Sequence, residues 1–412
     1  MPIVDKLKPR LRFKGFIDNW KQHKLEDFGS FVAGTSIEKD FSEGGIYKVI
    51  SIGSYSEDST YIDQGIRVNL TERTKNKILN KNDLAMILND KTSSGRIIGR
   101  VLLIDKSDMF VFNQRTEKIE IDETFLIPKF VYVLLNAPNI RSKIVKQSQG
   151  NTQIYVNWSS IKRTYYKIPQ IFEQQKIGTF FSNLDDIIYS NQKKLDKLIC
   201  IKKSLLEKVF PVNGANIPAI RFKKYANTWK YTKLEDVCAI SSGVNTPNNP
   251  SGMYYNLTMG SVSEEGKLLY SLKTNDASRL LKKGQLIMPT RDVGVGLIIG
   301  RVTYIPENDK FVAGNCLYVL DVNTVVTPLF LTYYVNSNNV RKQFARIISG
   351  GSQKQITLQN VYKLDICFPE LLEEQEKLGS LISNLDDIIE LYRHKLEKLK
   401  NIKKACLEDM LI

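Results

Sequence analysis

The chain has 412 residues, 42% of them hydrophobic and 25% charged, which is the composition of a globular protein with room for two or three domains. Lysine and arginine number 59 against 44 aspartate and glutamate, a formal net charge of +15 that favours a polyanionic partner, most often nucleic acid. No apolar run is long enough to predict a membrane span, and only two histidines, His23 and His394, make a histidine-rich metal site or a Ser-His-Asp triad untenable.

The opening residues, MPIVDKLKPRLRFKGF, lack the apolar core and small-residue cleavage site of a secretory signal. The cysteines are scattered without a CxxC pair and read as reduced thiols; they are Cys200, Cys238, Cys316, Cys367 and Cys406. These features predict a cytoplasmic protein.

Residues 1–168 mix strand-like runs, such as GIYKVISIG and FVYVLL, with Gly, Asn and Ser turns, and predict a compact α+β domain. Residues 169–210 differ, because apolar residues recur there in steps of three and four after Pro169. This spacing predicts a long amphipathic helix with one apolar seam, to which we assign Leu184, Ile188, Leu195 and Leu198.

The same order then returns. Residues 211–368 predict a second α+β domain with strand-like runs such as CLYVLDV, and residues 369–412 predict a second long helix. Its seam is assigned to Leu385, Ile389, Leu396 and Leu399. A helix of about 33 residues is roughly 50 Å long and would leave its apolar stripe in water. We therefore expect the two helices to form an antiparallel pair, the alternative being that each packs on its own domain.

The repeat extends from end to end. The heptapeptide SNLDDII occurs at Ser182–Ile188 and at Ser383–Ile389, inside longer matches that begin EQQKIG and EQEKLG. Upstream, GRIIGRV resembles GLIIGRV, and RFKGFIDNW…KLEDF resembles RFKKYANTW…KLEDV. The matches keep their order, which indicates a tandem duplication of a unit of about 200 residues, far longer than a solenoid repeat.

No catalytic motif is found. GVG at Gly294–Gly296 lacks the rest of a dinucleotide-binding loop, and GSVSEEGKL at Gly260–Leu268 has the wrong spacing and no Ser or Thr for a phosphate loop. No NPPF or DPPY motif of an amino-methyltransferase is present. The acidic pairs Asp185–Asp186 and Asp386–Asp387 are expected near the first turns of the long helices, in a structural or partner-contact role. We predict a protein that is not an enzyme and needs no metal or cofactor.

A basic chain built as domain, long helix, domain, long helix resembles the specificity subunit of type I restriction-modification enzymes. The resemblance is carried by the two RFK…W…KLED segments and by the two helix starts of pattern P…EQ.K(I/L)G…L…D, and it covers nearly the whole chain. It implies two target recognition domains that each read half of a bipartite duplex DNA site. It also implies a coiled-coil spacer that docks two methyltransferase subunits, with restriction subunits joining them, and no chemistry in the chain itself.

Comparison of the copies sorts the candidate DNA contacts. Base readers should differ between copies, whereas matched residues suit phosphate contacts or the fold. The unmatched candidates come from LNDKTSSGR and TRDVGVG: Lys91, Ser93, Ser94, Arg96, Arg291 and Asp292. The candidates for the DNA backbone come from GNTQ and GGSQK: Thr152, Gln153, Ser352, Gln353 and Lys354. For each residue the competing interpretation is an ordinary solvated loop.

Two other functions stay open on the sequence alone. The chain could be a two-fold scaffold that bridges two protein partners without touching DNA, or a nucleic-acid enzyme in its own right. The sequence does not name the bases that are read or the gap between half-sites.

Overall fold

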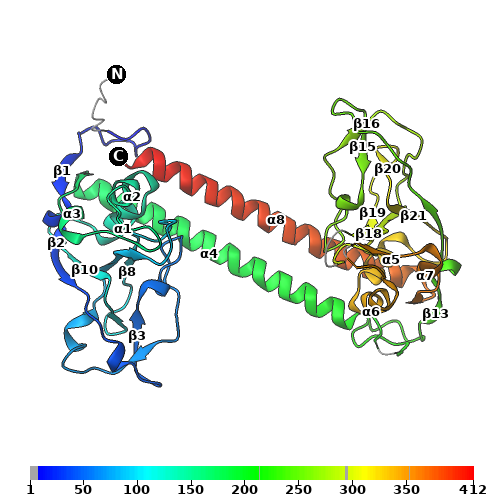
Figure 1. Cartoon of the computed structure of the whole chain (residues 1–412), viewed down its shortest axis with the longest axis horizontal. Helices are drawn as coiled ribbons and strands as arrows, with labels where there is room; N and C mark the ends of the chain where they lie inside the picture. The colour runs from blue at the N-terminus through cyan, green and yellow to red at the C-terminus, as the bar shows by residue number, and fades with distance from the viewer. Residues whose placement is uncertain (1–7, 213, 293–295, 352) are drawn as a thin grey trace. The chain divides into compact units, whose positions relative to one another are not determined.

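A computed structural model describes residues 8–212, 214–292, 296–351 and 353–412 (Figure 1). The chain forms two compact units: unit 1 comprises Met1–Gln192 and His394–Ile412, and unit 2 comprises Lys193–Arg393. The long helices α4 (Ile171–Lys208) and α8 (Leu372–Met410) each begin in one unit and end in the other. The division of the chain at residues 168, 210 and 368 stays a prediction, although α4 and α8 begin within four residues of two of these positions.

Unit 1 contains two four-stranded sheets, with strand orders β2-β10-β6-β8 and β4-β3-β9-β5, and the two-stranded ribbons β1-β12 and β7-β11. All pairs are antiparallel except β3 with β9. The strands are β1 Lys21–Lys24, β2 Gly29–Ala33, β3 Tyr47–Ile50, β4 Arg67–Val68, β5 Ile78–Leu79, β6 Leu84–Ile87, β7 Asn89–Asp90, β8 Val101–Leu103, β9 Phe110–Phe112, β10 Thr116–Ile121, β11 Ile154–Tyr155 and β12 Tyr165–Ile168. The short helices are α1 Pro128–Asn136, α2 Pro138–Val145 and α3 Trp158–Ile161.

Unit 2 repeats this plan. Its sheets have the orders β14-β21-β17-β19 and β16-β15-β20, and its ribbons are β13-β23 and β18-β22. The strands are β13 Lys230–Lys233, β14 Cys238–Ser242, β15 Tyr254–Leu257, β16 Lys273–Thr274, β17 Leu286–Pro289, β18 Arg291–Asp292, β19 Thr303–Tyr304, β20 Phe311–Ala313, β21 Leu317–Val322, β22 Lys354–Gln355 and β23 Asp365–Phe368. The short helices are α5 Pro328–Val335, α6 Asn338–Ile347 and α7 Leu358–Tyr362.

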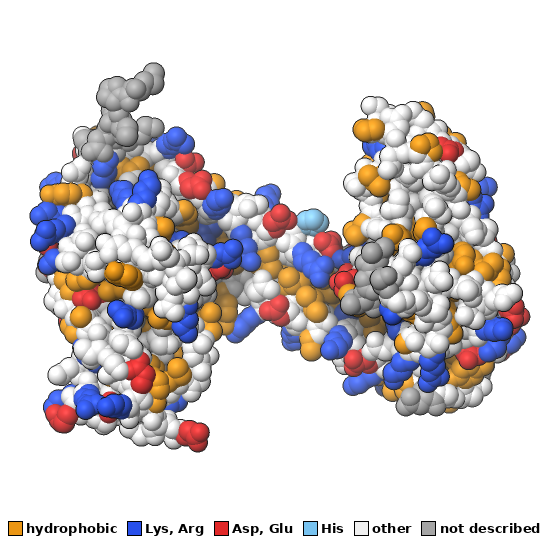
Figure 2. Space-filling view, in the orientation of Figure 1, with side chains coloured by type: hydrophobic (Ala, Val, Ile, Leu, Met, Phe, Trp, Pro, Cys, Tyr) orange, Lys and Arg blue, Asp and Glu red, His pale blue; other side chains and the backbone are white. Residues whose placement is uncertain are grey.

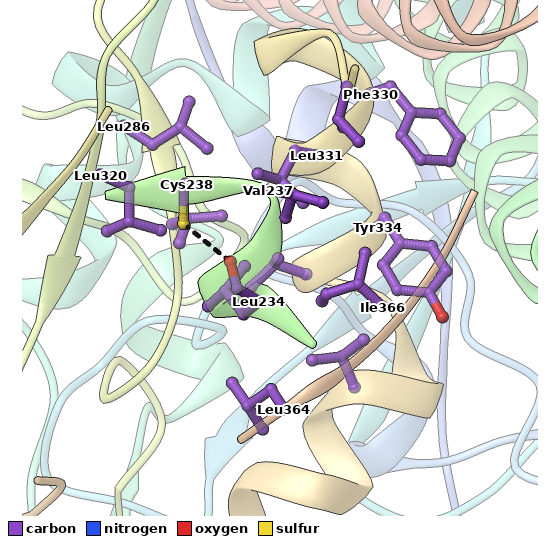
Figure 3. Packing of buried hydrophobic residues seen from close by; sticks show 14 of the residues in the cluster. Leu234, Val237, Cys238, Leu286, Leu320, Phe330, Leu331, Tyr334, Leu364 and Ile366 are labelled. Atoms are coloured by element: carbon purple, nitrogen blue, oxygen red, sulfur yellow. Dashed lines mark hydrogen bonds between the residues drawn. The ribbon is translucent and has the colours of Figure 1, made fainter. Parts of the chain in front are cut away.

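The main core of each unit lies between the first sheet, the short helices and a long helix. In unit 2, Leu286 and Leu320 from the sheet pack with Phe330 and Tyr334 of α5, and Figure 3 shows this packing. The Cys238 thiol, which donates to the Leu234 carbonyl oxygen at 3.4 Å, is part of the same core. Helix α5 is apolar on nearly all sides, because it packs both against the sheet and against α8, whose Gly379 lies close to it.

The segment FVYVLL, expected as a strand, lies in helix α1. Pro128 occupies the first helical turn, where proline is favourable because its missing N–H needs no partner there. Phe130, Val131 and Leu134 are fully buried at helical spacing. The β-branched and aromatic composition misled the prediction, and burial of the helix overrides that weak propensity.

The start of each long helix is joined to its domain by the EQ motif. Arg12 donates from Nε and Nη2 to the two carboxylate oxygens of Glu173, both at 2.7 Å, and Glu173 is 1% exposed. The next side chain, Gln174, accepts from the backbone N–H of Ile127 and donates to the carbonyl oxygens of Phe125 and Pro169. These bonds join three parts of unit 1: the segment around Arg12 before β1, which we call the strap, the loop before α1, and the start of α4.

Unit 2 uses the corresponding residues. Arg221 donates to both oxygens of Glu374 at 2.7 and 2.8 Å, and Gln375 accepts from Thr327 N–H and donates to the carbonyl oxygens of Val325 and Pro369. The glycine of the motif has a steric purpose. A Cβ atom on Gly178 would lie 3.0 Å from the backbone nitrogen of Phe130, so glycine lets α1 approach the helix closely.

Within unit 1, the beginning of α4 and the end of α8 run antiparallel. Asp185 pairs with Lys403 at 2.5 Å. Further toward the start of α4, Ile177 shares a core with Met410 at the end of α8. Asn139 of α2 donates to the carbonyl oxygen of Leu411 at 2.8 Å and so fixes the end of α8 on the domain.

Within unit 2, the other halves of the helices pair in the same way. Lys202 of α4 forms an ion pair with Asp386 of α8, and Phe210, beyond the end of α4, shares a core with Ile382. Asn339 of α6 donates to the carbonyl oxygen of Pro211 at 3.0 Å, matching the contact made by α2 in unit 1. The predicted fold class is thereby confirmed: two tandem α+β domains with two long helices that pair antiparallel.

The residues assigned to the seam are shielded from solvent. Buried members are Leu184, Leu195, Ile389 and Leu396, and partly buried members are Ile188, Leu198, Leu385 and Leu399. Which of these side chains meet across the seam stays a prediction.

The expected place of the acidic pairs was wrong. Asp185 lies about four turns inside α4, beyond the reach of the helix dipole, which acts in the first turn. Asp185 and Asp386 are instead the acidic partners of the cross-helix ion pairs with Lys403 and Lys202. The hydroxyl group of Tyr333 also donates to Asp386 at 3.0 Å.

Glu374→Ala should lower the free energy of unfolding by about 3–5 kcal/mol, because it leaves the largely buried Arg221 guanidinium without its partner. Denaturant unfolding followed by circular dichroism measures this. The control is Glu373→Ala, whose carboxylate is half exposed and pairs with Lys224 and Lys377 at the surface. Equal destabilisation by the two variants would contradict a special role for the buried pair.

Glu117 should make stability depend on pH. It is the second residue of β10 and is 4% exposed. Burial raises its pKa to about 7, against the opposing influence of Lys77. Since the folded state favours the protonated carboxyl, this stabilisation is complete below pH 4.5, the ordinary value, and is lost as the pH rises through about 7.

Glu117→Gln should remove that dependence. Between pH 5 and pH 8 the melting temperature of the wild-type chain should fall more than that of the variant. Glu120→Gln, an exposed change on the same strand, serves as the control and should follow the wild type. Parallel melting profiles for Glu117→Gln and wild type would contradict the assignment.

Candidate nucleic-acid interface

Each unit brings its two candidate segments together in one ribbon. In unit 1, β7 pairs with β11 so that Asn89 lies opposite Tyr155 and Asp90 opposite Ile154. In unit 2, β18 pairs with β22 so that Arg291 lies opposite Gln355 and Asp292 opposite Lys354. The segments are about 60 residues apart in the chain, and the sequence did not predict that they pair.

The second residue of the first strand in each ribbon is an aspartate, and its carboxylate holds the loop that follows. Asp90 accepts from the backbone N–H and hydroxyl group of Thr92 and from the backbone N–H of Ile97. Asp292 accepts from the backbone N–H of Ile298 at 3.2 Å in the same way. This common bond makes Asp292 the counterpart of Asp90 and gives it a structural role. Base reading by Asp292 stays an untested prediction.

One arginine in each unit, from α2 in unit 1 and from α6 in unit 2, holds the segment that follows the first ribbon strand. Arg141 donates to the carbonyl oxygens of Gly95 and Ile98, and Arg341 donates to that of Ile299 at 2.7 Å. Burial and, to a smaller extent, the charge of nearby Arg301 together lower the pKa of Arg341 to about 10. The charges of Arg341 and Arg301 add positive potential near this segment, which favours an approaching phosphate.

A tight turn precedes the second strand of each ribbon. Gln149 exchanges two backbone hydrogen bonds with Tyr155, at 2.8 and 2.9 Å, and Ser349 exchanges two with Gln355. Gly150 closes the turn with φ +99°, and a Cβ atom there would lie 2.2 Å from the Gln153 carbonyl oxygen. Only glycine fits this position, which explains the glycine of GNTQ and, at Gly350, of GGSQ.

The candidates for the DNA backbone lie in these turns. Thr152, Gln153 and Gln353 are exposed, and Ser352 lies outside the described residues. The ammonium group of Lys354 donates to the Gly350 carbonyl oxygen at 3.0 Å, so part of its hydrogen-bonding capacity is used within the turn. All five stay predictions.

The base-reading candidates of the first copy lie on the loop after β7. Lys91, Ser93 and Ser94 are exposed, and the hydroxyl groups of Ser94 and Thr92 are 2.6 Å apart. Arg96 is exposed but forms an ion pair with Glu57 at 3.0 Å. In the second copy, the corresponding residues 293–295 of TRDVGVG lie outside the described part of the chain, and Arg291 is exposed.

The ribbon register identifies residues that the sequence comparison missed. Because Asp90 corresponds to Asp292, the counterpart of Arg291 is Asn89, and Tyr155 and Gln355 stand opposite them. Exposed cations also flank the turns at matched positions, Lys146 after α2 and Arg346 at the end of α6. The sequence did contain this information, because the loop from Asp292 to Ile298 is one residue shorter than the loop from Asp90 to Ile97. The shift could be recognised only once the structure gave the strand pairing.

The repeated SNLDDII segments present a second surface. Ile187 is 47% exposed and Ile388 is 43% exposed, and each lies two residues after the aspartate of a cross-helix ion pair. Asp186 and Asp387 beside them are also exposed. Further exposed apolar residues on the two helices are Phe172, Tyr189, Ile199, Ile201, Leu381, Leu391 and Ile402. Exposed apolar side chains that gather on one element are typical of protein-protein contacts.

Figure 2 shows Lys and Arg side chains on both units and on the helices, in line with the net charge of +15. Among the described residues, no group of three or more His, Cys, Asp or Glu side chains could hold a metal ion. No helix within the described ranges is long and apolar enough to cross a membrane.

Comparisons with known proteins agree with this geometry. A family model described as "Type I restriction modification DNA specificity domain" matches residues 17–199 and again residues 226–401. Two relatives from Methanocaldococcus jannaschii are the type I restriction enzyme MjaVIII specificity subunit and the MjaIX specificity subunit. They are 21% and 23% identical to this chain, over 96% and 94% of it and 92% of each relative.

Solved structures share the fold. A crystal structure of the type I restriction-modification system S subunit from M. genitalium matches with a TM-score of 0.67 at 15% identity, covering 98% of this chain and 99% of that one. A chain from a structure of complex assembly and conformational transition of the type I R-M system matches with a TM-score of 0.51 at 15% identity, covering 94% of this chain and 96% of that one.

Proposed function

The chain belongs to the family of type I restriction-modification DNA specificity domains, of which it contains two copies, and on that premise we propose that it is the DNA-recognition subunit of a methyltransferase and nuclease complex. Each unit reads one half of a bipartite duplex site. The helices separate the half-sites and dock two methyltransferase subunits, with restriction subunits joining the full complex.

The observation that carries this proposal is the ribbon that both units build in the same register. The residues that hold it and its loop are alike in the two copies, namely the aspartate that binds the loop, the glycine of the turn and the arginine that binds the segment after the loop. The exposed residues on the ribbon differ. A common support with different exposed residues suits two recognition sites for two different sequences.

Charge supports a DNA partner over a protein-only scaffold. A net charge of +15 favours a polyanion, and Arg341 and Arg301 add positive potential near the segment that follows the first ribbon strand of unit 2. The test is binding of the chain, with and without methyltransferase subunits, to duplex DNA at several salt concentrations. We expect sequence-specific binding that weakens steeply as salt rises. A chain that bridges methyltransferase subunits but leaves DNA unbound is the scaffold alternative.

We also propose that the chain itself catalyses nothing. The relatives are specificity subunits, and the sequence offers no methyltransferase or nuclease motif. Incubation of the pure chain with S-adenosylmethionine and its target duplex should transfer no methyl group, whereas addition of the methyltransferase subunits should restore transfer. Methylation by the pure chain would refute this part of the proposal.

Docking should depend on the exposed isoleucines of SNLDDII. Ile388→Asp should leave the melting temperature unchanged, because the side chain is already 43% exposed, yet prevent binding of one methyltransferase subunit. Ile187→Asp should prevent binding of the other, and the double variant should bind neither. Native mass spectrometry measures the stoichiometry.

The neighbouring residue provides the control. Ile389 is 3% exposed, so Ile389→Asp buries an unpaired charge and should destabilise the chain by several kcal/mol. Normal assembly by the double variant Ile187→Asp, Ile388→Asp would place the docking surface elsewhere.

The gap between half-sites should be fixed. Helix α4 has 38 residues and α8 has 39, without proline inside either, so each is a continuous helix of about 57 Å. Inserting one or two base pairs between the half-sites should therefore abolish specific binding in a filter-binding assay. Unchanged affinity would mean that the two units bind DNA independently.

A further inference from the structure

Three side chains lie in a row across each ribbon. In a β ladder, directly opposed residues point to the same face and the next pair points to the other face. In unit 1, Tyr155 is paired with Asn89 on one side and Gln149 on the other. In unit 2, Gln355 is paired with Arg291 and Ser349. We call each set of three a cross-strand row.

The two faces of the ribbon have different environments. The row residues are exposed, except Asn89, which is partly exposed. On the opposite face, Asp90 and Ile154 are buried in unit 1, and Asp292 and Lys354 are partly buried in unit 2. One face therefore holds the ribbon on the domain and the other presents the row to solvent.

The rows differ at every position, with Asn, Tyr and Gln in unit 1 against Arg, Gln and Ser in unit 2. Their side chains are largely those that recognise base edges. Arginine donates two bonds to guanine O6 and N7, and asparagine or glutamine bonds adenine N6 and N7. Within each row the hydrogen bonds join backbone atoms, as in the two between Ser349 and Gln355.

The dimensions fit the major groove. Adjacent strands lie about 4.8 Å apart, so a row of three spans about 10 Å. At about 3.4 Å for each base-pair step, this covers about three base pairs. The groove is about 12 Å wide and admits a small β-ribbon.

We propose that the cross-strand rows are the base-reading elements. Arg291 contacts a guanine in the half-site of unit 2, Asn89 contacts an adenine in the half-site of unit 1, and the residues opposite them read the neighbouring base pairs. This inference rests on the proposed function and adds to it the residues and the bases. It moves the centre of recognition in unit 1 from the loop of Lys91 to the row.

The experiment substitutes row residues so that one preferred base should be replaced by another, and not simply lost. The chain is assembled with its methyltransferase subunits, and duplexes from a randomised library are selected on the complex and sequenced. In Arg291→Gln, guanine should give way to adenine at one position of one half-site. In Asn89→Arg, adenine should give way to guanine in the other half-site. Each change should alter discrimination by about 5- to 150-fold.

Arg346→Ala is the matched control, since Arg346 is an exposed cation near the ribbon but outside the row. It should weaken binding to all sequences alike and reduce the salt slope by about one. Unchanged melting temperatures and methyltransferase binding establish that the row variants are folded.

Two results would overturn the inference, and they are distinguishable. If Arg291→Gln and Asn89→Arg weaken binding to every sequence equally, the rows contact phosphate and the proposed function stands. If the wild-type complex selects no sequence at all, the proposed function fails and the inference fails with it.

Discussion

The buried arginine–glutamate pair at the start of each long helix is the contact on which each unit depends. A helix of 38 residues carries far more apolar surface than its own turns can cover, so its first turns must be fixed within a folded domain. Glu173 and Glu374 do this by binding an arginine from a strap about 150 residues away. Because both charges leave water, the pair is stable only in the right geometry, and it therefore selects one docking of strap, helix and domain.

The duplication made much of this fold predictable. Two helix starts with the same EQ and glycine pattern predicted two long helices, and the period of their apolar residues predicted the shielded seam. The sequence failed where local signals conflict with tertiary packing. FVYVLL has strand composition but covers a sheet as a helix. Asp185 was assigned to a first turn, although the helix predicted after Pro169 already places it about four turns inside. The sheet that α1 covers and the Lys403 side chain that pairs with Asp185 both come from distant parts of the chain, so a short stretch of sequence does not reveal them.

The candidate site was predictable only in outline. The sequence indicated both segments of each ribbon, since one copy could be compared with the other. It could not supply the register, because strands of two residues have no period to read. Without the register, the correspondence of Asp292 with Asp90 and of Arg291 with Asn89 could not be recognised. The bond from Ile298 to Asp292 resolves that alignment.

In each ribbon, the residues that hold the fold are separate from the exposed residues of the row, and this separation affects how the recognised DNA sequence can change. Substituting the exposed residues of a row removes no buried contact and should alter stability by about 0.5 kcal/mol or less. Changing Asp90 or Gly150 would instead leave a buried N–H group unpaired or force a Cβ atom against a carbonyl group. Recognition and folding thus rest on different residues of one ribbon. On the proposed function, one half-site can change while the helices and the other unit keep their structure.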